Sequence, residues 1–269
     1  MLRKLLALAA LCLGLAAAAP TLADGPALKT PPGGWSFSGP LGMYDQEQLQ
    51  RGFKVYVQVC SACHAMNYVA FHQLGDPGAP YWSPKYPNPN DNPYVKAIAA
   101  SWPRQVTEIN ADTGDPGHRP ATTADVLVPP FPNDAAAKAS NGGALPPDMS
   151  LLVAAREGGP DYVYSIVISD GLPTPAGMTL PPGKYYDPYF TGGAIGMPPP
   201  LTDCKVTFDD GKPCDVASEA RDVSAFLQWA SDPKMNERKQ TGIAVLIYLA
   251  LFSGILYLSY RAIWRNVGH

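Results

Sequence analysis

Hydrophobic residues are concentrated in one uncharged stretch near each end of the chain, and polar residues interrupt them in between. The first stretch covers residues 5–19, follows Arg3 and Lys4, and precedes a small-x-small cleavage pattern at residues 21–23. A stretch of about fifteen apolar residues is short for hydrocarbon about 30 Å thick, which argues against a first transmembrane helix. We therefore predict a signal peptide over residues 1–23 and export of the rest of the chain.

The second stretch predicts a membrane anchor. Residues 241–260 are all uncharged, would be about 30 Å long as a helix, and have basic residues on both flanks. The stretch is apolar on every face, unlike a helix that packs one face against a core. Together with the signal peptide, it predicts a single-pass protein of the inner (cytoplasmic) membrane. Residues 24–233 would form a periplasmic domain, and residues 234–269 the anchor and a short cytoplasmic tail. We expect the anchor to make no contact with the core of that domain.

Helical spacing of apolar residues predicts two main helices in the periplasmic part. The first lies between Asp45, a residue type that caps helices, and Cys60. The second covers residues 218–230, where one apolar stripe ends before a proline. Gly52 has no side chain and lies on the same face of the first helix as Cys60. We expect the two helices to cross in close contact at this glycine.

Other segments carry weaker patterns. Asn92-Pro93 is a cap and first-turn pair for a short helix, and residues 148–156 predict another helix. Residues 163–169 contain β-branched residues typical of a strand, but Pro160-Asp161 before them favours a helix. Residues 74–145 are dense in Pro, Gly, Asn and Asp and predict a long surface loop.

The proline and glycine content sets the fold class. The 269 residues include 30 prolines and 25 glycines. Proline lacks a backbone donor and interrupts both helix interiors and sheet ladders. We therefore predict a mainly α domain whose short helices are joined by long Pro/Gly-rich loops, followed by one C-terminal transmembrane helix.

Charge separates the periplasmic part from the rest of the chain. Residues 24–233 contain 22 acidic and 13 basic residues, a net charge of −9, whereas the whole chain carries −3. Such a surface either keeps the domain soluble or steers a cationic partner toward it. We favour the second interpretation and expect a basic protein partner. No nucleic-acid partner is expected.

Cysteine placement points to the chemistry. Cys12 would be lost with the signal peptide, and the four cysteines that remain would leave the reducing cytosol. Residues 60–64, CSACH, form the C-x-x-C-H pattern of haem attachment. Two cysteines three residues apart can reach the two vinyl groups at one edge of a porphyrin, and the next residue then lies under the iron. The pattern predicts one covalently bound haem c on Cys60 and Cys63, with His64 as an iron ligand.

A redox dithiol and a zinc site are the alternatives for this motif. A thioredoxin-like C-x-x-C follows a strand and precedes a helix, whereas a predicted helix precedes this one. A zinc site needs two further ligands at matched spacing, but nine residues lie between Cys204 and Cys214. These two cysteines have each other as partners, and we predict a possible disulfide between them.

A haem that carries electrons without binding small molecules needs a second axial ligand. Most methionines lie too close to His64 or in predicted packing positions: Met43, Met66, Met149 and Met235. Met178 and Met197 stay open, and we favour Met197 because three prolines after it stiffen its loop. His/Met ligation raises the reduction potential, which suits an electron carrier. An open sixth position would instead predict a haem enzyme or gas sensor.

Several segments along the exported part match one known family. They are residues 51–56 (RGFKVY), 59–64 (VCSACH), 66–70 (MNYVA), 143–148 (GALPPD), 188–190 (PYF), 194–197 (AIGM), 208–211 (FDDG) and 226–230 (FLQWA). Together they resemble the cytochrome c1 family of bacterial type, the haem subunit of the ubiquinol–cytochrome c oxidoreductase (bc1) complex.

The resemblance implies a cytochrome c-like fold with an enlarged loop region and agrees with Met197 as the second ligand. It also implies that Arg156 and Tyr162 lie at the haem propionates. The chain would be no enzyme by itself but a redox subunit, passing electrons from a Rieske iron–sulfur protein to a soluble basic c-type cytochrome. Cytochrome b would be the partner that oxidises ubiquinol. A free-standing membrane-anchored cytochrome is the alternative.

Overall fold

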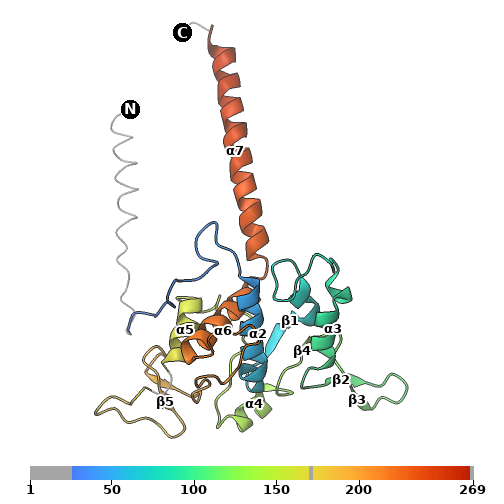
Figure 1. Ribbon diagram of the computed structural model, residues 1–269, viewed down its shortest axis with the longest axis vertical. Coiled ribbons are helices and arrows are strands. Elements are labelled where there is room, and N and C mark those ends of the chain that lie inside the picture. The colour runs from blue at the N-terminus through green and yellow to red at the C-terminus, as the bar shows by residue number, and fades with distance from the viewer. Residues whose placement is uncertain (1–25, 170–171, 267–269) are drawn as a thin grey trace.

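The computed structural model describes residues 26–169 and 172–266, so the predicted signal peptide lies outside the described residues. The described chain is mainly helical, as predicted, and one long helix projects from its body (Figure 1). The α-helices are α2 (Gln46–Gln58), α3 (Pro93–Ala100), α4 (Asp134–Ser140), α5 (Pro160–Ile168), α6 (Val216–Ser231) and α7 (Met235–Trp264). The short 3₁₀ helices are η2 (Cys60–Ala62), η3 (Phe71–Gly75) and η4 (Pro89–Asp91).

In the part of the chain that the structure describes, the strands form three small antiparallel pairs rather than one sheet. β1 (Met66–Ala70) pairs with β4 (Val126–Leu127), β2 (Val106–Ile109) with β3 (Pro116–Arg119), and β5 (Tyr185–Tyr186) with β6 (Ala194–Ile195). The long loop predicted over residues 74–145 therefore contains α3, α4, the β2–β3 hairpin and β4. Apart from α3, which its cap predicts, these short elements escape sequence analysis because none is long enough to establish a period.

Side-chain caps explain where the predicted helices begin. The Asp45 carboxylate accepts a hydrogen bond from the Gln48 amide at the start of α2 (3.1 Å), and Asn92 does the same at α3 for Tyr94 (3.0 Å). Asp215 caps α6. The helices predicted between Asp45 and Cys60, after Asn92, after Pro160 and over residues 218–230 are confirmed.

The crossing of α2 and α6 is the centre of the fold. A Cβ atom placed on Gly52 would lie 2.6 Å from the backbone carbonyl carbon of Asp222 and 2.7 Å from Cβ of Phe226. Phe226 is fully buried, with its ring centroid 5.4 Å from that of Phe53 and 5.5 Å from that of Trp229. The close crossing expected at Gly52 is confirmed, and any side chain there would force the helices apart.

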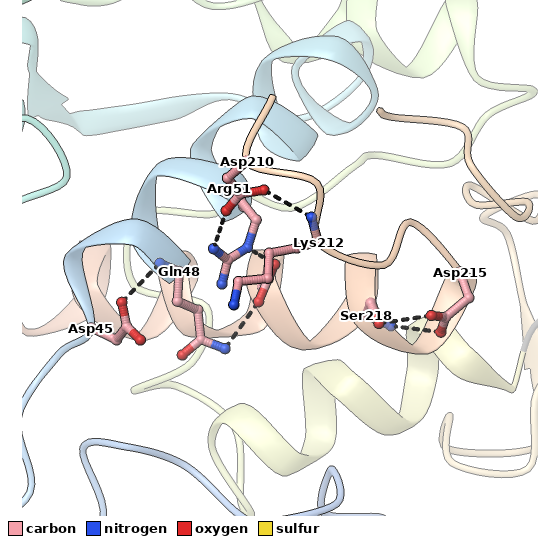
Figure 2. Close-up of polar contacts among 8 residues, drawn as sticks. Asp45, Gln48, Arg51, Asp210, Lys212, Asp215 and Ser218 are labelled. Atoms are coloured by element: carbon pink, nitrogen blue, oxygen red, sulfur yellow. Dashed lines mark hydrogen bonds and ion pairs between the residues drawn. The ribbon is translucent and has the colours of Figure 1, made fainter. Parts of the chain in front are cut away.

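A partly buried ion-pair cluster, with Asp222 and Gln48 buried and Asp210 exposed, fixes the two helices to a third segment. Arg51 Nε donates to Asp222 Oδ2 at 2.6 Å, and Gln48 Nε2 donates to Asp222 Oδ1 at 3.0 Å. Arg51 also reaches Asp210 at 2.7 Å, so the loop around residue 210 is tied to α2 (Figure 2). Burial raises the pKa of Asp222 and outweighs the opposing effect of Arg51. The cluster therefore sets the register of the crossing.

One predicted helix is wrong. Residues 149–159 form turns instead of a regular helix. Some of their amides bond locally, as Ala155 does to the Leu151 carbonyl (3.0 Å), but the polar groups at the start of the segment bond to β1. The Asp148 carboxylate accepts from the Asn67 amide at 2.9 Å, and the Ser150 hydroxyl accepts from the Tyr68 amide at 3.0 Å. These bonds to β1 outweigh the helical periodicity of the segment.

The base of α7 packs against the domain, contrary to expectation. Met235 is buried in the hydrophobic core, and the Asn236 side-chain oxygen accepts from the Tyr44 amide at 3.1 Å. The rest of the helix is long, apolar and exposed, contains an 18-residue stretch with a mean hydropathy of 2.1, and fits a membrane span. The domain boundary predicted at residue 233 therefore cuts off the first turns of α7, which belong structurally to the body.

Two truncations test this boundary. A chain that ends after Gln240 keeps Met235 and the contacts of α7, and we expect it to be soluble, folded and haem-loaded. A chain that ends after Asp232 loses a buried methionine and should be less stable by about 2–3 kcal/mol. Thermal unfolding of both domains measures the difference, and Met235→Ala in the longer domain is the matched control. Equal stability of the two truncated domains would contradict the packing of Met235 into the core.

Candidate functional site

One cavity collects the predicted cofactor-binding residues. It has a volume of about 530 Å³ and lies between the C-x-x-C-H turn, α5, α6 and the loop after β6. All six predicted residues line it: Cys60, Cys63, His64, Arg156, Tyr162 and Met197. They come from four separate segments of the chain, which the fold places around the same cavity.

The two thiols and the imidazole lie on one turn. α2 ends at Gln58, and the chain tightens into η2, where the Cys63 amide donates to the Cys60 carbonyl at 3.1 Å. The His64 amide donates to the same carbonyl at 2.9 Å. Both cysteine side chains therefore line the cavity from the same turn, and the imidazole of the next residue, His64, lines it beside them.

The imidazole of His64 is oriented by the backbone. Its Nδ1 lies 2.8 Å from the carbonyl oxygen of Pro147, which can only accept, so Nδ1 carries the proton and Nε2 is left to bind a metal. The side chain is buried, and this burial lowers the pKa of His64. A neutral imidazole with Nε2 available is the form that ligates iron.

The carbonyl of Pro147 is held in place by the segment that follows it. Residues 148–150 run beside residues 65–68, and the Met149 amide donates to the Ala65 carbonyl at 2.8 Å. The bonds of Asp148 and Ser150 to β1 continue this pairing. The failed helix prediction thus falls on the segment that positions His64.

Met197 is the methionine best placed to complete the site. It lines the cavity in the loop after β6, whereas Met178 is absent from the lining and its methyl carbon lies near Gly193. Met149 also lines the cavity, but it is two residues from Pro147 and so lies on the His64 side. Gly196 is crowded, since an added Cβ would lie 3.2 Å from Cβ of Ala144. The Met197 loop is therefore packed against the cavity wall.

The walls of the cavity are mostly apolar. Val223 and Leu227 line it from α6, and the remaining apolar side chains include Leu145, Leu152, Val163, Ile166, Phe190, Ile195 and Leu201. Two polar residues of the wall, Asn141 and Lys184, were not predicted, because isolated polar residues in loops follow no period. Arg156 is exposed at the rim of the cavity and, among the described residues, donates only to the neighbouring carbonyl of Ala155 (3.2 Å).

These residues fit a covalently bound haem. Two thiols at one edge, a neutral imidazole on one side and a thioether in a separate loop form a donor set for haem c, and the apolar walls suit a porphyrin. Within residues 26–169 and 172–266, no group of three or more His, Cys, Asp and Glu side chains lies together as a metal site. The thiols of Cys60 and Cys63 thus lack the further ligands that a structural zinc site uses.

Cys204 and Cys214 lie apart from this cavity. The structure pairs them, with Cα atoms 4.5 Å apart, a separation typical of disulfides. We propose that this bond forms in the exported protein. It closes a loop that contains Asp210, the partner of Arg51.

Alkylation tests the disulfide. In the unfolded, unreduced protein we expect no alkylation at Cys204 or Cys214, and addition of two alkyl groups after reduction, as read by intact mass. Replacing both cysteines with Ser should lower the free energy of unfolding by about 2–3 kcal/mol, since the loop is short. Free alkylation of both thiols without reductant would disprove the pairing.

Comparison with known proteins identifies relatives over most of the chain. A sequence model of the Cytochrome C1 family matches residues 35–267. The chain is 40% identical to cytochrome c1 of Rhodospirillum rubrum over 95% of this chain and 97% of that protein, and 39% identical to cytochrome c1 of Blastochloris viridis over 96% and 94%. It is also 40% identical to cytochrome b/c1 of Bradyrhizobium diazoefficiens, covering 88% of this chain but 36% of that longer protein.

Proposed function

The chain belongs to the cytochrome c1 family and carries a covalently bound haem c, and we propose that it is the electron-transfer subunit of a ubiquinol–cytochrome c reductase complex. In this proposal it receives single electrons from a Rieske iron–sulfur protein and passes them to a soluble c-type cytochrome. Cytochrome b, which oxidises ubiquinol, is its membrane partner. Relatives named as cytochrome b/c1 and as a subunit of the cytochrome b-c1 complex support membership of such an assembly.

The single observation that carries the proposal is the cavity that unites Cys60, Cys63, His64 and Met197. When bound, haem supplies an iron that alternates between the ferric and ferrous states and so transfers one electron at a time. Cys60 and Cys63 would hold the porphyrin edge, and His64, oriented by Pro147, and Met197 would ligate the iron. With both ligands in place, the site would be closed to small molecules.

The remaining residues of the site would bind the haem propionates and shield the centre of the cavity from water. We propose that Arg156 and Tyr162 hold the propionates at the rim, where Arg156 is exposed and offers several donors. The apolar side chains of α5 and α6 exclude water from the centre of the cavity. In this proposal the residues of the cavity have no acid–base or nucleophilic role, as expected for an electron carrier.

The position of the anchor completes the proposal. α7 spans the inner membrane, the haem domain lies in the periplasm, and the C-terminal tail lies in the cytoplasm. The predicted signal peptide and the exposed apolar surface of α7 support this orientation.

Purification in mild detergent tests the proposed function. A reduced-minus-oxidised spectrum of the purified material should show b-type haem together with haem c, because a bc1 subunit brings cytochrome b with it. Haem c alone would indicate a free-standing anchored cytochrome. Binding of carbon monoxide to the reduced wild-type protein would indicate an open sixth position and therefore a haem enzyme or gas sensor.

The acidic domain predicts salt-sensitive electron transfer. The net charge of −9 over residues 24–233 should attract a basic cytochrome c, and screening confines this attraction to about 8–10 Å at physiological salt. We expect the bimolecular rate of electron transfer to fall steeply as ionic strength rises. Stopped-flow measurement with a basic cytochrome c provides the test. A rate that stays flat or rises would show that the charge serves solubility alone.

A further inference from the structure

The loop before α2 lies beside the base of α7. In Figure 1 the loop rises next to the lower end of α7, on the side of the body from which that helix projects. Its backbone is tied to the helix by one side chain, since Lys239 Nζ donates to the carbonyl oxygens of Phe37 (2.6 Å), Gly39 (2.7 Å) and Gly42 (2.9 Å). The loop is therefore fixed by hydrogen bonds to the second turn of α7.

Inward-pointing aromatic side chains hold the loop in shape. Trp35, Phe37 and Tyr44 are buried, and the Trp35 and Phe37 rings stack with centroids 5.3 Å apart. The Met43 amide donates to the Ser36 carbonyl at 3.1 Å, which closes the loop. The buried rings and this hydrogen bond thus anchor both ends of the tip to the body.

The tip presents apolar side chains to the outside. Leu41 is 77% exposed and Met43 is 40% exposed. Residues 31–44 contain no charged residue, although the domain as a whole carries −9. A single exposed leucine on a soluble surface needs no explanation, but an uncharged apolar tip beside a membrane-spanning helix does.

The contact with Lys239 determines where this tip lies along the axis of α7. The uncharged stretch of α7 begins at residue 241, two residues after Lys239, and two residues of helix rise about 3 Å. The carbonyls bound to Lys239 therefore lie at the level where α7 enters the membrane. Leu41, between two of them in sequence, lies at the same boundary.

We propose that the loop over residues 36–43 is a second membrane contact, which places Leu41 and Met43 among the lipid headgroups and upper acyl chains. The lack of charge lets this part of an acidic domain approach lipid, and continuity with α7 brings it there. The Lys239 ammonium is already bound by three carbonyls, so the contact is apolar rather than an attraction to anionic headgroups.

A spin label at position 41 tests the proposal on the full-length, haem-loaded chain in lipid nanodiscs. The variant Leu41→Cys carries a nitroxide, the haem is kept reduced, and wild-type chain labelled in parallel gives the background. Ile109→Cys is the matched control, because Ile109 is 65% exposed in β2 and lies far from α7 (Figure 1).

At position 41 we expect relaxation by oxygen to exceed relaxation by a water-soluble nickel chelate several-fold, and the reverse at position 109. Equal access of the nickel chelate at both positions would overturn the proposal. Shielding of position 41 that appears only when other subunits are present, and not in nanodiscs that hold this chain alone, would assign the loop to a protein partner and would also overturn it.

Discussion

Replacing Met197 with Leu should leave haem attached and open its sixth position. The thioether bonds to Cys60 and Cys63 do not depend on the second ligand, so pyridine haemochrome spectra should show unchanged haem content. Loss of the thioether ligand should lower the reduction potential by on the order of 100 mV, within the range of about 0.8 V that axial ligands span. Redox titration measures this fall, and carbon monoxide should now bind the ferrous protein.

The matched control is Met149→Leu, because Met149 lines the same cavity on the His64 side. We expect the reduction potential of this variant to differ from the wild-type value by only a small fraction of the fall in Met197→Leu. The variant should also exclude carbon monoxide. If Met197→Leu instead retained the ferric thioether-to-iron absorption band and excluded carbon monoxide, another group would be the ligand. Met178 would then be tested in the same way.

Gly52→Ala should strongly destabilise the domain, although it adds only one methyl group. The added Cβ meets the backbone of Asp222 and Cβ of Phe226 at 2.6–2.7 Å, and neither can rotate away. Overpacking of this kind costs about 1–3 kcal/mol or more, and a clash with backbone falls at the upper end of that range. Chemical denaturation of the truncated soluble domain should show the loss as a lower midpoint.

Gly242→Ala in the full-length chain is the control for helix propensity. Gly242 lies in α7 with nothing within 4 Å of an added Cβ, so alanine there should leave thermal unfolding of the haem domain unchanged. A Gly52→Ala domain with wild-type stability would mean that α2 and α6 separate at little cost, contrary to the packing of Phe53 against Phe226.

The sequence predicted the elements whose signals are local. Capping residues such as Asp45 and Asn92 determine where helices begin, and C-x-x-C-H defines a whole turn of the site, so both kinds of element can be located from neighbouring residues alone. Met197 could be favoured because the prolines after it restrict its loop. The structure brings this methionine into the cavity of His64, which spacing alone could only suggest.

The parts that escaped prediction depend on distant contacts. Residues 148–156 carry a helical pattern, but hydrogen bonds to β1 hold them in turns, and those partners lie about 80 positions away in sequence. Met235 was expected in a packing position but lies beyond the boundary predicted at residue 233, and its packing into the core of the domain depends on contacts that only the fold provides. Lys184 and Asn141 reach the cavity from loops whose course no periodicity describes.

The helix α6 both packs against α2 and forms part of the cavity wall. Its Asp222 and Phe226 pack against α2, while Val223 and Leu227, one position further along, line the cavity. A local opening that exposed the cavity on this side would have to break the crossing as well. The site therefore cannot unfold as a separate cooperative unit, and amide hydrogens along the middle of α6 should exchange only through global unfolding. Exposure of the covalently attached haem on this side and loss of the native fold would then be a single event with a single free energy.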